Sequence, residues 1–280
     1  MSNIEINNLT FGYTDQLIFQ NANINIDDKW KLGLVGRNGR GKTTLLKIIM
    51  GQIKSEINIK SNKHFVYFPQ EVQEQDQLTI LILQELAIFE QCKLERELKL
   101  LEVELDTLWR PFDTLSGGEQ TKILLALLFL DDYNFPLIDE PTNHLDKASR
   151  KKVADYLAEK KGYILISHDR NFLNETTDHT LAIERAELQM YAGNFAVYEE
   201  EKRLRDITEK AQDYKLKKEI GRLKQTAREK ESWSHNLEAT KSRKKRGFDS
   251  DTKRVDKGFI GRKAANMMQK SKNLEKRMKE

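Results

Sequence analysis

Hydrophobic and polar residues alternate along the start of the chain as they do in half-buried β-strands. The stretches IEINNLTFGY and NANINIDDKW show this alternation, and in the second Ile24 and Ile26 share one face while the neighbouring asparagines share the other. Shorter apolar runs, which we also expect to be strands, are KLGLVG, INIK, HFVYF, FPLID and YILIS. Because helical segments separate these runs, the sequence predicts an α/β fold with a largely parallel sheet.

Apolar residues at helical spacing follow several of these strands. KTTLLKIIMG comes directly after KLGLVG, and we expect it to form a helix that ends at Gly51. From Leu78 to Trp109 the leucines recur at steps of three and four, which predicts one narrow apolar seam along a helical region. The leucines of this seam are Leu94, Leu98, Leu101, Leu105 and Leu108.

The chain changes character at Glu199, where Lys and Glu become frequent and strand-like runs almost disappear. Apolar residues recur at heptad-like spacing before and after a polar stretch without periodicity, which predicts a helical hairpin over 199–280 with a basic tip at about 239–257. The second helix has no Gly, Asn or Pro stop signal before Glu280. We therefore expect a helix that is cut rather than capped at this residue.

The charge of the chain is divided unevenly. The hydrophobic fraction is 38% and the charged fraction 33%, against usual values of about 45–50% and about 25%, so part of the chain is expected to be non-globular. Residues 1–198 contain 22 Lys and Arg against 29 Asp and Glu, whereas residues 199–280 contain 26 against 15, which gives net charges of −7 and +11. The basic part suggests a polyanionic partner, either nucleic acid or an anionic membrane surface; the alternative is a solvated helical arm.

Composition also excludes several classes of site. Cys92 is the only cysteine, which rules out an internal disulfide and a cysteine-based metal cluster. The five histidines lack ligand spacing, so a metal is expected only together with a nucleotide. The chain has no apolar run of about 18 residues and no signal peptide pattern, so we expect a cytoplasmic protein without membrane insertion.

The stretch GRNGRGKT fits the phosphate-binding pattern G-x-x-x-x-G-K-[ST] and lies between a predicted strand and a predicted helix. In such a loop the backbone amides surround the phosphates, Lys42 reaches the β- and γ-phosphates, and the Thr43 hydroxyl ligates Mg²⁺. Arg37 and Arg40 are extra cations that we expect to point into solvent. The predicted nucleotide-binding residues here are Gly36, Arg37, Asn38, Gly39, Arg40, Gly41, Lys42, Thr43 and Thr44.

Two further motifs add chemistry to this loop. FPLIDE delivers two carboxylates to the end of an apolar strand, where Asp139 would hold Mg²⁺ and Glu140 would polarise an attacking water. An Asp-Glu pair alone often marks only a strand end, but the upstream loop makes the catalytic interpretation the stronger one. LSGGEQ, with Ser116 and two glycines opening a helix, predicts a second anion site.

These motifs together resemble the ATP-binding-cassette (ABC) ATPases. LSGGEQ is similar to their signature, DEPTNHLD to the Walker B motif and D-loop, YFPQE to the Q-loop and LISHDR to the histidine switch, all in the family's order. The resemblance implies a P-loop ABC nucleotide-binding domain over 1–198, with a mixed sheet and a helical subdomain at about 78–130, followed by the α-helical hairpin. It also implies that ATP and Mg²⁺ are the ligands.

The resemblance assigns roles to further residues. Gln70 would sense Mg²⁺ and the γ-phosphate, His168 would contact the γ-phosphate, and Asp146 would couple two nucleotide sites. Tyr13 matches the aromatic residue that stacks on adenine, although a tyrosine of the core is the alternative. The signature residues, which would cap the γ-phosphate of ATP held by a facing cassette, are Ser116, Gly117 and Gly118.

PTNHLD is similar to the ABC-F group, which acts on ribosomes and has two cassettes joined by a helical linker. ESWSHNLEATK, DKGFIGRKAANMM and SKNLEKR resemble its Lsa and Vga-like antibiotic-resistance members. This implies a ribosome partner at the large-subunit rRNA and tRNA region, protection against lincosamides, pleuromutilins and streptogramin A, and a second cassette, in trans or from a C-terminal half absent here. Without that cassette we expect weak hydrolysis or none.

The predicted hairpin tip would carry the contacts with RNA, because clustered cations suit phosphates and exposed aromatics suit unpaired bases. For Trp233 and Phe259, packing between the hairpin helices is an equal alternative. Two other functions remain open from the sequence: an ATP-binding subunit of an ABC transporter, and a hydrolysis-deficient fragment that binds only nucleotide and RNA. The predicted RNA-binding residues are Lys241, Arg243, Lys244, Lys245, Arg246 and Phe248.

Overall fold

The computed structural model describes residues 3–13, 16–184, 186–243 and 266, and the chain divides into two compact units, Met1–Glu201 and Lys202–Glu280. The first unit, here called the cassette, contains two sheets. One is antiparallel, with the order β2-β1-β4. Its strands are β1 (Asn3–Tyr13), β2 (Gln16–Asp27) and β4 (Glu56–Lys60).

The second sheet has six strands in the order β5-β6-β7-β3-β8-β9, and only the edge strand β9 is antiparallel to its neighbour. The mixed α/β architecture expected from the sequence is therefore present. The carboxyl ends of the five parallel strands lie at one edge of the sheet, where ligands bind in α/β folds. The strands are β3 (Lys31–Gly36), β5 (His64–Phe68), β6 (Asn134–Asp139), β7 (Tyr163–Ile166), β8 (His179–Glu184) and β9 (Glu187–Tyr191).

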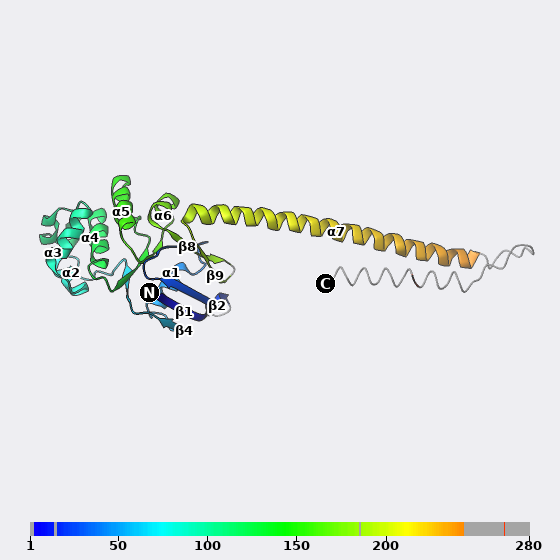
Figure 1. Ribbon diagram of the computed structural model, residues 1–280, viewed down its shortest axis with the longest axis horizontal. Helices are drawn as coiled ribbons and strands as arrows, with labels where there is room; N and C mark the ends of the chain where they lie inside the picture. Colours follow the sequence, from blue (N-terminus) through cyan, green and yellow to red (C-terminus); the bar gives the residue numbers. More distant parts are fainter. Residues whose placement is uncertain (1–2, 14–15, 185, 244–265, 267–280) are drawn as a thin grey trace, which may run out of the picture. The chain divides into compact units, whose positions relative to one another are not determined.

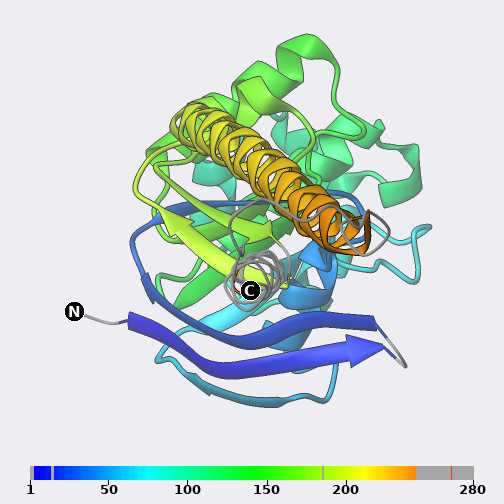
Figure 2. The same ribbon diagram turned by 90° about the vertical axis from the view of Figure 1, so that its right-hand side faces the viewer.

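Different layers cover the two faces of this sheet (Figures 1 and 2). Successive side chains of a strand point to opposite faces, so in β3 Leu32 and Leu34 join one core and Val35 joins the other. The first core lies between the sheet, α1 (Lys42–Ile49) and the antiparallel sheet. The second core includes residues of α2 (Thr79–Leu86), α3 (Gln91–Leu100), α4 (Gly117–Leu128), α5 (Lys147–Glu159) and α6 (Arg170–Thr176).

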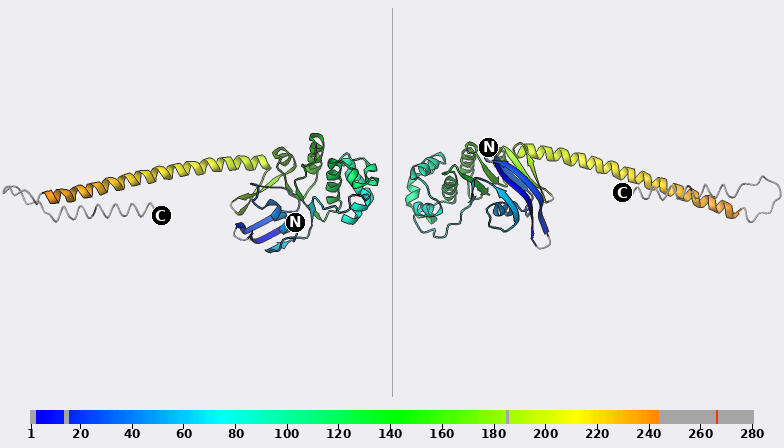
Figure 3. Two further views of the ribbon diagram at one scale, coloured as in Figure 1. Left: turned by 180° about the vertical axis from the view of Figure 1, so that it is seen from behind. Right: turned by 60° about the horizontal axis from the view of Figure 1, so that its bottom comes forward.

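The leucines at helical spacing between Leu78 and Trp109 pack into one core, as the expected apolar seam implies, but they do not lie on one continuous helix. The region forms α2, α3 and a 3-10 helix, η1 (Leu105–Trp109), followed by η2 (Phe112–Thr114), and Glu102 adopts a left-handed φ of 53° between α3 and η1. Tertiary packing overrides the helical pattern here, because the turn returns Val103 and Leu108 to the core that already holds Leu98. These helices group together on the side of the cassette away from β1, β2 and β4 (Figure 3).

The second unit begins within one long helix, α7 (Phe195–Arg243). Its 49 residues rise about 74 Å at about 1.5 Å per residue. Because the helix continues to Arg243, the first residues of the expected tip, 239–243, are helical. The rest of the tip and the expected second helix lie outside the described residues, apart from Asn266. No helix in the described ranges is both long enough and apolar enough to cross a bilayer.

Candidate functional site

The phosphate-binding loop connects β3 to α1, as its motif predicts. Gly39 and Gly41 adopt positive φ values of 76° and 93°. A Cβ atom at Gly41 would lie 2.4 Å from Ile18 Cγ2, so only glycine fits this turn. Among the described residues, no side chain caps the N-terminus of α1. The first amides of the helix are therefore available to an anion.

The side chains of this loop divide into two groups. Lys42 Nζ donates to the Gly36 carbonyl oxygen at 3.0 Å and lies folded over the loop. Burial lowers the pKa of the Lys42 ammonium, while the carboxylates of Glu140 and Asp139 oppose this shift. The remaining loop positions, which are exposed, are Arg37, Asn38, Gly39 and Arg40.

Asp139 lies at the end of β6 and connects three segments of the cassette. Its Oδ2 atom accepts a hydrogen bond from Thr43 Oγ1 at 2.8 Å and another from the Tyr67 hydroxyl at 3.0 Å. Burial and the adjacent Asp139 carboxylate raise the pKa of Tyr67, so this phenol stays protonated and remains a donor. The sequence analysis did not single out Tyr67, although it lies within the YFPQE motif.

Glu140 follows directly and has a left-handed backbone, with φ 52°. Its amide donates to the Ile166 carbonyl oxygen at 2.9 Å, and its Oε2 atom accepts from the His168 amide at 3.2 Å. The His168 Nε2 atom lies 3.4 Å from Glu140 Oε1, an oxygen that is buried and has no hydrogen-bond partner in the described part of the chain. Burial raises the pKa of Glu140, against the lowering effect of His168. A carboxylate with a raised pKa suits a general base.

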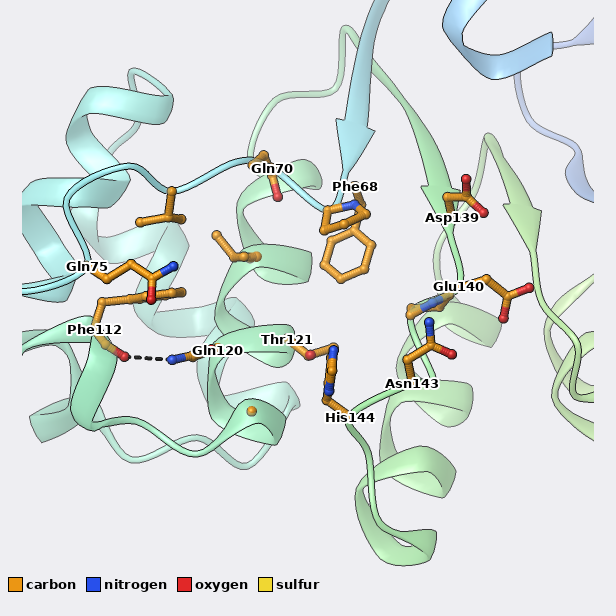
Figure 4. Close-up of a pocket in the computed structure, with 15 residues that line it drawn as sticks. Phe68, Gln70, Gln75, Phe112, Gln120, Thr121, Asp139, Glu140, Asn143 and His144 are labelled. Carbon is orange, nitrogen blue, oxygen red and sulfur yellow. Dashed lines mark hydrogen bonds between the residues drawn. The ribbon is translucent and has the colours of Figure 1, made fainter. Parts of the chain in front are cut away.

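Gln70 completes this group of polar side chains. Its Oε1 atom is buried and, within the described ranges, has no hydrogen-bond partner. It lines a cavity of about 280 Å³ together with Asp139, Glu140 and His144. Figure 4 shows Gln70 on the segment after β5 and the two carboxylates at the end of β6. Amide, carboxylate and hydroxyl oxygens are the donors that Mg²⁺ prefers, so Gln70, Asp139 and Thr43 fit this cation chemically.

The signature stretch forms the N-terminus of α4. Ser116 is the N-cap residue, and its side chain accepts from the Glu119 amide at 3.2 Å. The Ser116 amide and hydroxyl both donate to Glu119 Oε2 at 2.7 Å, which completes a capping box. These bonds lower the pKa of Glu119. Gly117 lies against His144 of the D-loop, since a Cβ atom at Gly117 would be 3.2 Å from His144 Cβ.

The D-loop and the histidine switch are linked within the cassette. Asp146 caps α5 by accepting from the Ser149 amide at 3.0 Å, and hydrogen bonds from the side chain and the amide of Ser149 lower the pKa of Asp146. One turn later, Arg150 Nη1 pairs with Asp169 Oδ2 at 2.9 Å. Asp169 directly follows His168 and caps α6. The sequence analysis missed the pair of Arg150 and Asp169, because only the packing of α5 beside α6 brings these residues together.

Tyr13, the predicted adenine-stacking residue, is 52% exposed, so it is not a residue of the core. It contacts the Phe11 ring edge to face, with centroids 5.0 Å apart. Lys241 and Arg243 belong to α7. The other predicted RNA-binding residues lie outside the described residues, and they are Lys244, Lys245, Arg246 and Phe248.

The structure thus brings the P-loop, Asp139, Glu140, Gln70 and His168 to one edge of the sheet. Gly117 of the signature lines the cavity beside this group. Across the described ranges, no hydrogen bond or ion pair joins Ser116 to the P-loop.

Comparison with known proteins agrees with this geometry. The ABC transporter family matches residues 19–143. The ABC transporter F family member 5 of Arabidopsis thaliana is 30% identical over 211 residues, which cover 70% of this chain and 30% of that protein. The ribosome protection protein VmlR of Bacillus subtilis (strain 168) is 30% identical over 277 residues, which cover 98% of this chain and 47% of that protein. This chain therefore spans less than half the length of these two relatives.

Solved structures share the fold. A bacterial ABC transporter cassette, solved as a dimer, superposes with a TM-score of 0.56 at 20% identity, over 68% of this chain and 98% of that chain. The match over residues 19–143, the fold and the arrangement of motifs show an ABC cassette within this chain, and the relatives support an ATPase of the ABC-F type.

Proposed function

We propose that this protein is an ABC-F ATPase that binds the ribosome in its ATP-bound state and protects the large subunit from antibiotics, in the manner of the Lsa and Vga-like group. One observation carries the proposal. The similarity to a ribosome protection protein covers 98% of this chain, so it continues past the cassette into residues 199–280, whose net charge is +11. Such a protein would work in the cytoplasm, where ribosomes are.

ATP is the proposed substrate, and the P-loop holds its phosphates. The open N-terminus of α1 and the Lys42 ammonium face the β- and γ-phosphates, while Tyr13 stacks on the adenine. Thr43, Asp139 and Gln70 would hold Mg²⁺. When bound, the cation neutralises charge on the phosphates during phosphoryl transfer.

Hydrolysis needs a group that takes a proton from the attacking water. Glu140 fits this role because it is partly buried, has a raised pKa and has one buried oxygen without a hydrogen-bond partner among the described residues. His168 lies beside this carboxylate and would contact the γ-phosphate. Glu140 therefore acts as the base, and His168 holds the transferred group in place.

The signature residues are proposed to act on ATP held by a second cassette, which belongs either to another chain or to a longer form of this one. The lack of any described bond between Ser116 and the P-loop supports this arrangement, and the similar transporter cassette was solved as a dimer. Ser116, Gly117 and Gly118 would cap the facing γ-phosphate, and Asp146 would couple the two sites. Hydrolysis by one cassette alone should accordingly be weak.

The basic residues that follow Glu199 are proposed to bind rRNA near the tRNA-binding region. Cations that neutralise phosphates release counterions, so such binding falls steeply with salt. Phe248 would stack on an unpaired base. The proposed phosphate contacts are Lys241, Arg243, Lys244, Lys245 and Arg246.

The test uses the Glu140→Gln variant, which should bind ATP without hydrolysing it. We expect this variant to co-sediment with ribosomes when ATP is present at moderate salt. The matched control is the double variant Glu140→Gln, Lys42→Met, which should stay in the supernatant because it cannot hold ATP. Equal co-sedimentation of both variants, with or without ATP, would contradict an ATP-dependent ribosome function.

A second experiment tests the RNA contacts. Alanine at the five proposed cations should weaken co-sedimentation and flatten its dependence on salt. The control replaces five other cations of α7, all exposed, with alanine: Lys210, Lys215, Lys217, Lys218 and Lys224. An identical loss in both variants would indicate a general charge effect. Protection of cell-free translation from a lincosamide then tests the resistance role directly.

A further inference from the structure

Tyr67 is a residue of β5 that lies three positions before Gln70. Its hydroxyl donates to Asp139 Oδ2 at 3.0 Å. The parallel register of β5 and β6, in which Tyr67 is paired with Leu137 and Phe68 with Ile138, fixes how far the hydroxyl stands from the carboxylate. Figure 4 shows Phe68 at the end of β5 and Asp139 at the end of the neighbouring strand.

Two hydroxyls meet at the same carboxylate oxygen. Thr43 also donates to Asp139 Oδ2, at 2.8 Å. The Thr43 oxygen is a predicted ligand of the cation, whereas the Tyr67 phenol is a neutral donor on a rigid strand. A metal-binding carboxylate is commonly oriented by a hydrogen bond from a neighbouring residue that does not touch the metal. Tyr67 has the geometry and the chemistry of such a neighbour.

Packing alone does not account for the hydroxyl. Phe65, two residues earlier and therefore on the same face of β5, contacts the ring of Phe135 edge to face at 6.0 Å without any hydroxyl. Both Phe65 and Tyr67 are partly buried against the same core. A phenylalanine at 67 would serve this core equally well, but it would leave Asp139 without its second donor.

We propose that Tyr67 is a positioning residue of the Mg²⁺ site, whose hydroxyl fixes the Asp139 carboxylate and ties it to the strand that leads to Gln70. The inference rests on the proposed binding of ATP with Mg²⁺. The hydrogen bond from Tyr67 to Asp139 then keeps the end of β6 at a constant distance from the segment after β5 that carries Gln70. A shift of the Q-loop would be transmitted to the carboxylate that holds the cation.

The test is the Tyr67→Phe variant, which keeps the ring and removes only the hydroxyl. Binding of a fluorescent ATP analogue is titrated with Mg²⁺ and, separately, in the presence of a chelator. We expect the Mg²⁺ concentration for half-maximal binding to rise about tenfold, as for other residues that orient a metal ligand. Affinity for the analogue without metal and the melting temperature should not change. Direct titration with Mn²⁺, followed by electron paramagnetic resonance, gives a second readout that is independent of hydrolysis.

The matched control is Tyr156→Phe, which removes a hydroxyl that donates to the Glu97 carboxylate at 2.6 Å, between α5 and α3. It should leave the Mg²⁺ requirement as in the wild type. An unchanged Mg²⁺ requirement in Tyr67→Phe would overturn the proposal, and so would a lower one, since the hydroxyl would then compete with the cation. If the wild-type chain bound no nucleotide with Mg²⁺ at all, the proposed function would fall, and this inference with it.

Discussion

Two helices of the cassette begin with glycine-rich, phosphate-type sequences, but their N-termini are built differently. In α1 the turn is made by Gly41 at φ 93°, and no described side chain caps the helix. In α4 the capping box of Ser116 and Glu119 already satisfies the amides of these two residues, which the helix start would otherwise leave free. The N-terminus of α1 is open to a phosphate, whereas at α4 a phosphate must displace Glu119 as the acceptor of the Ser116 hydroxyl.

The charges at the two termini also act in opposite directions on stability. Burial lowers the pKa of Lys42, so its charged form destabilises the folded cassette below the ordinary lysine pKa. The bonds from Ser116 lower the pKa of Glu119, so its charged form stabilises the folded cassette above the ordinary glutamate pKa. The charge at the start of α1 thus lowers the free energy of unfolding, whereas the charge at the start of α4 raises it.

The largest expected difference in stability comes from adding one methyl group to a glycine at the start of each helix. In Gly41→Ala the new Cβ atom would lie 2.4 Å from Ile18 Cγ2, at a backbone angle that disfavours alanine. We expect a loss of about 2 to 5 kcal/mol in the free energy of unfolding, from strain and overpacking. In Gly118→Ala the closest atom would be 3.8 Å away, so that variant should fold as stably as the wild type. Urea unfolding measures the free energy of unfolding of both variants, and equal losses in the two would contradict the predicted difference between the starts of α1 and α4.

A smaller effect is expected from Ser116→Ala, which removes the cap of α4. It should cost about 1 kcal/mol of stability at neutral pH. Because the pKa of Glu119 is lowered in the folded state, its contribution is present above the ordinary value of 4.5 and is lost as the pH falls through the folded pKa. The difference in the free energy of unfolding between wild type and Ser116→Ala should therefore become smaller in acid. Ser116→Asn, which restores a cap, should recover most of the stability, and urea unfolding across this pH range checks both points.

The smallest effect is expected from Lys42→Met in the absence of nucleotide. Removing an ammonium whose pKa is lowered by burial should leave the melting temperature at neutral pH unchanged or higher. The difference should vanish above the ordinary lysine pKa of 10.5, where the wild-type amine is neutral in both states. Lys47→Met, at an exposed position of the same helix, is the control. A lower melting temperature for Lys42→Met would mean that the ammonium stabilises the loop.

The sequence predicted those parts of the fold in which a motif sets the local geometry. KLGLVG, the glycines and KTTLLKII specify a strand, a turn and a helix in order, and β3, the P-loop and α1 follow them. The turn after α3 was not predicted, because Glu102 takes a left-handed φ of 53° in a stretch without Gly, Asn or Pro. Strands β8 and β9 were also missed, and the turn between them at Ala186, with φ 68°, has no turn residue either.

For the candidate site, motifs named the residues but not their partners. Lys42, Thr43 and Asp139 follow from their spacing along the chain. That Tyr67 shares an oxygen of Asp139 with Thr43 depends on strand order, because β5 and β6 are neighbours although 65 residues lie between Phe68 and Asn134. No single-sequence pattern gives such an order.

The most direct test of the contrast between the two termini is calorimetric titration of Mg²⁺-ATP into the wild-type chain, Lys42→Met and Ser116→Ala. We expect one nucleotide per wild-type chain and none for Lys42→Met. For Ser116→Ala we expect a dissociation constant within about twofold of the wild-type value, a difference of about 0.4 kcal/mol. Loss of binding in Ser116→Ala equal to that in Lys42→Met would contradict the claim that only the open terminus of α1 holds nucleotide within this chain.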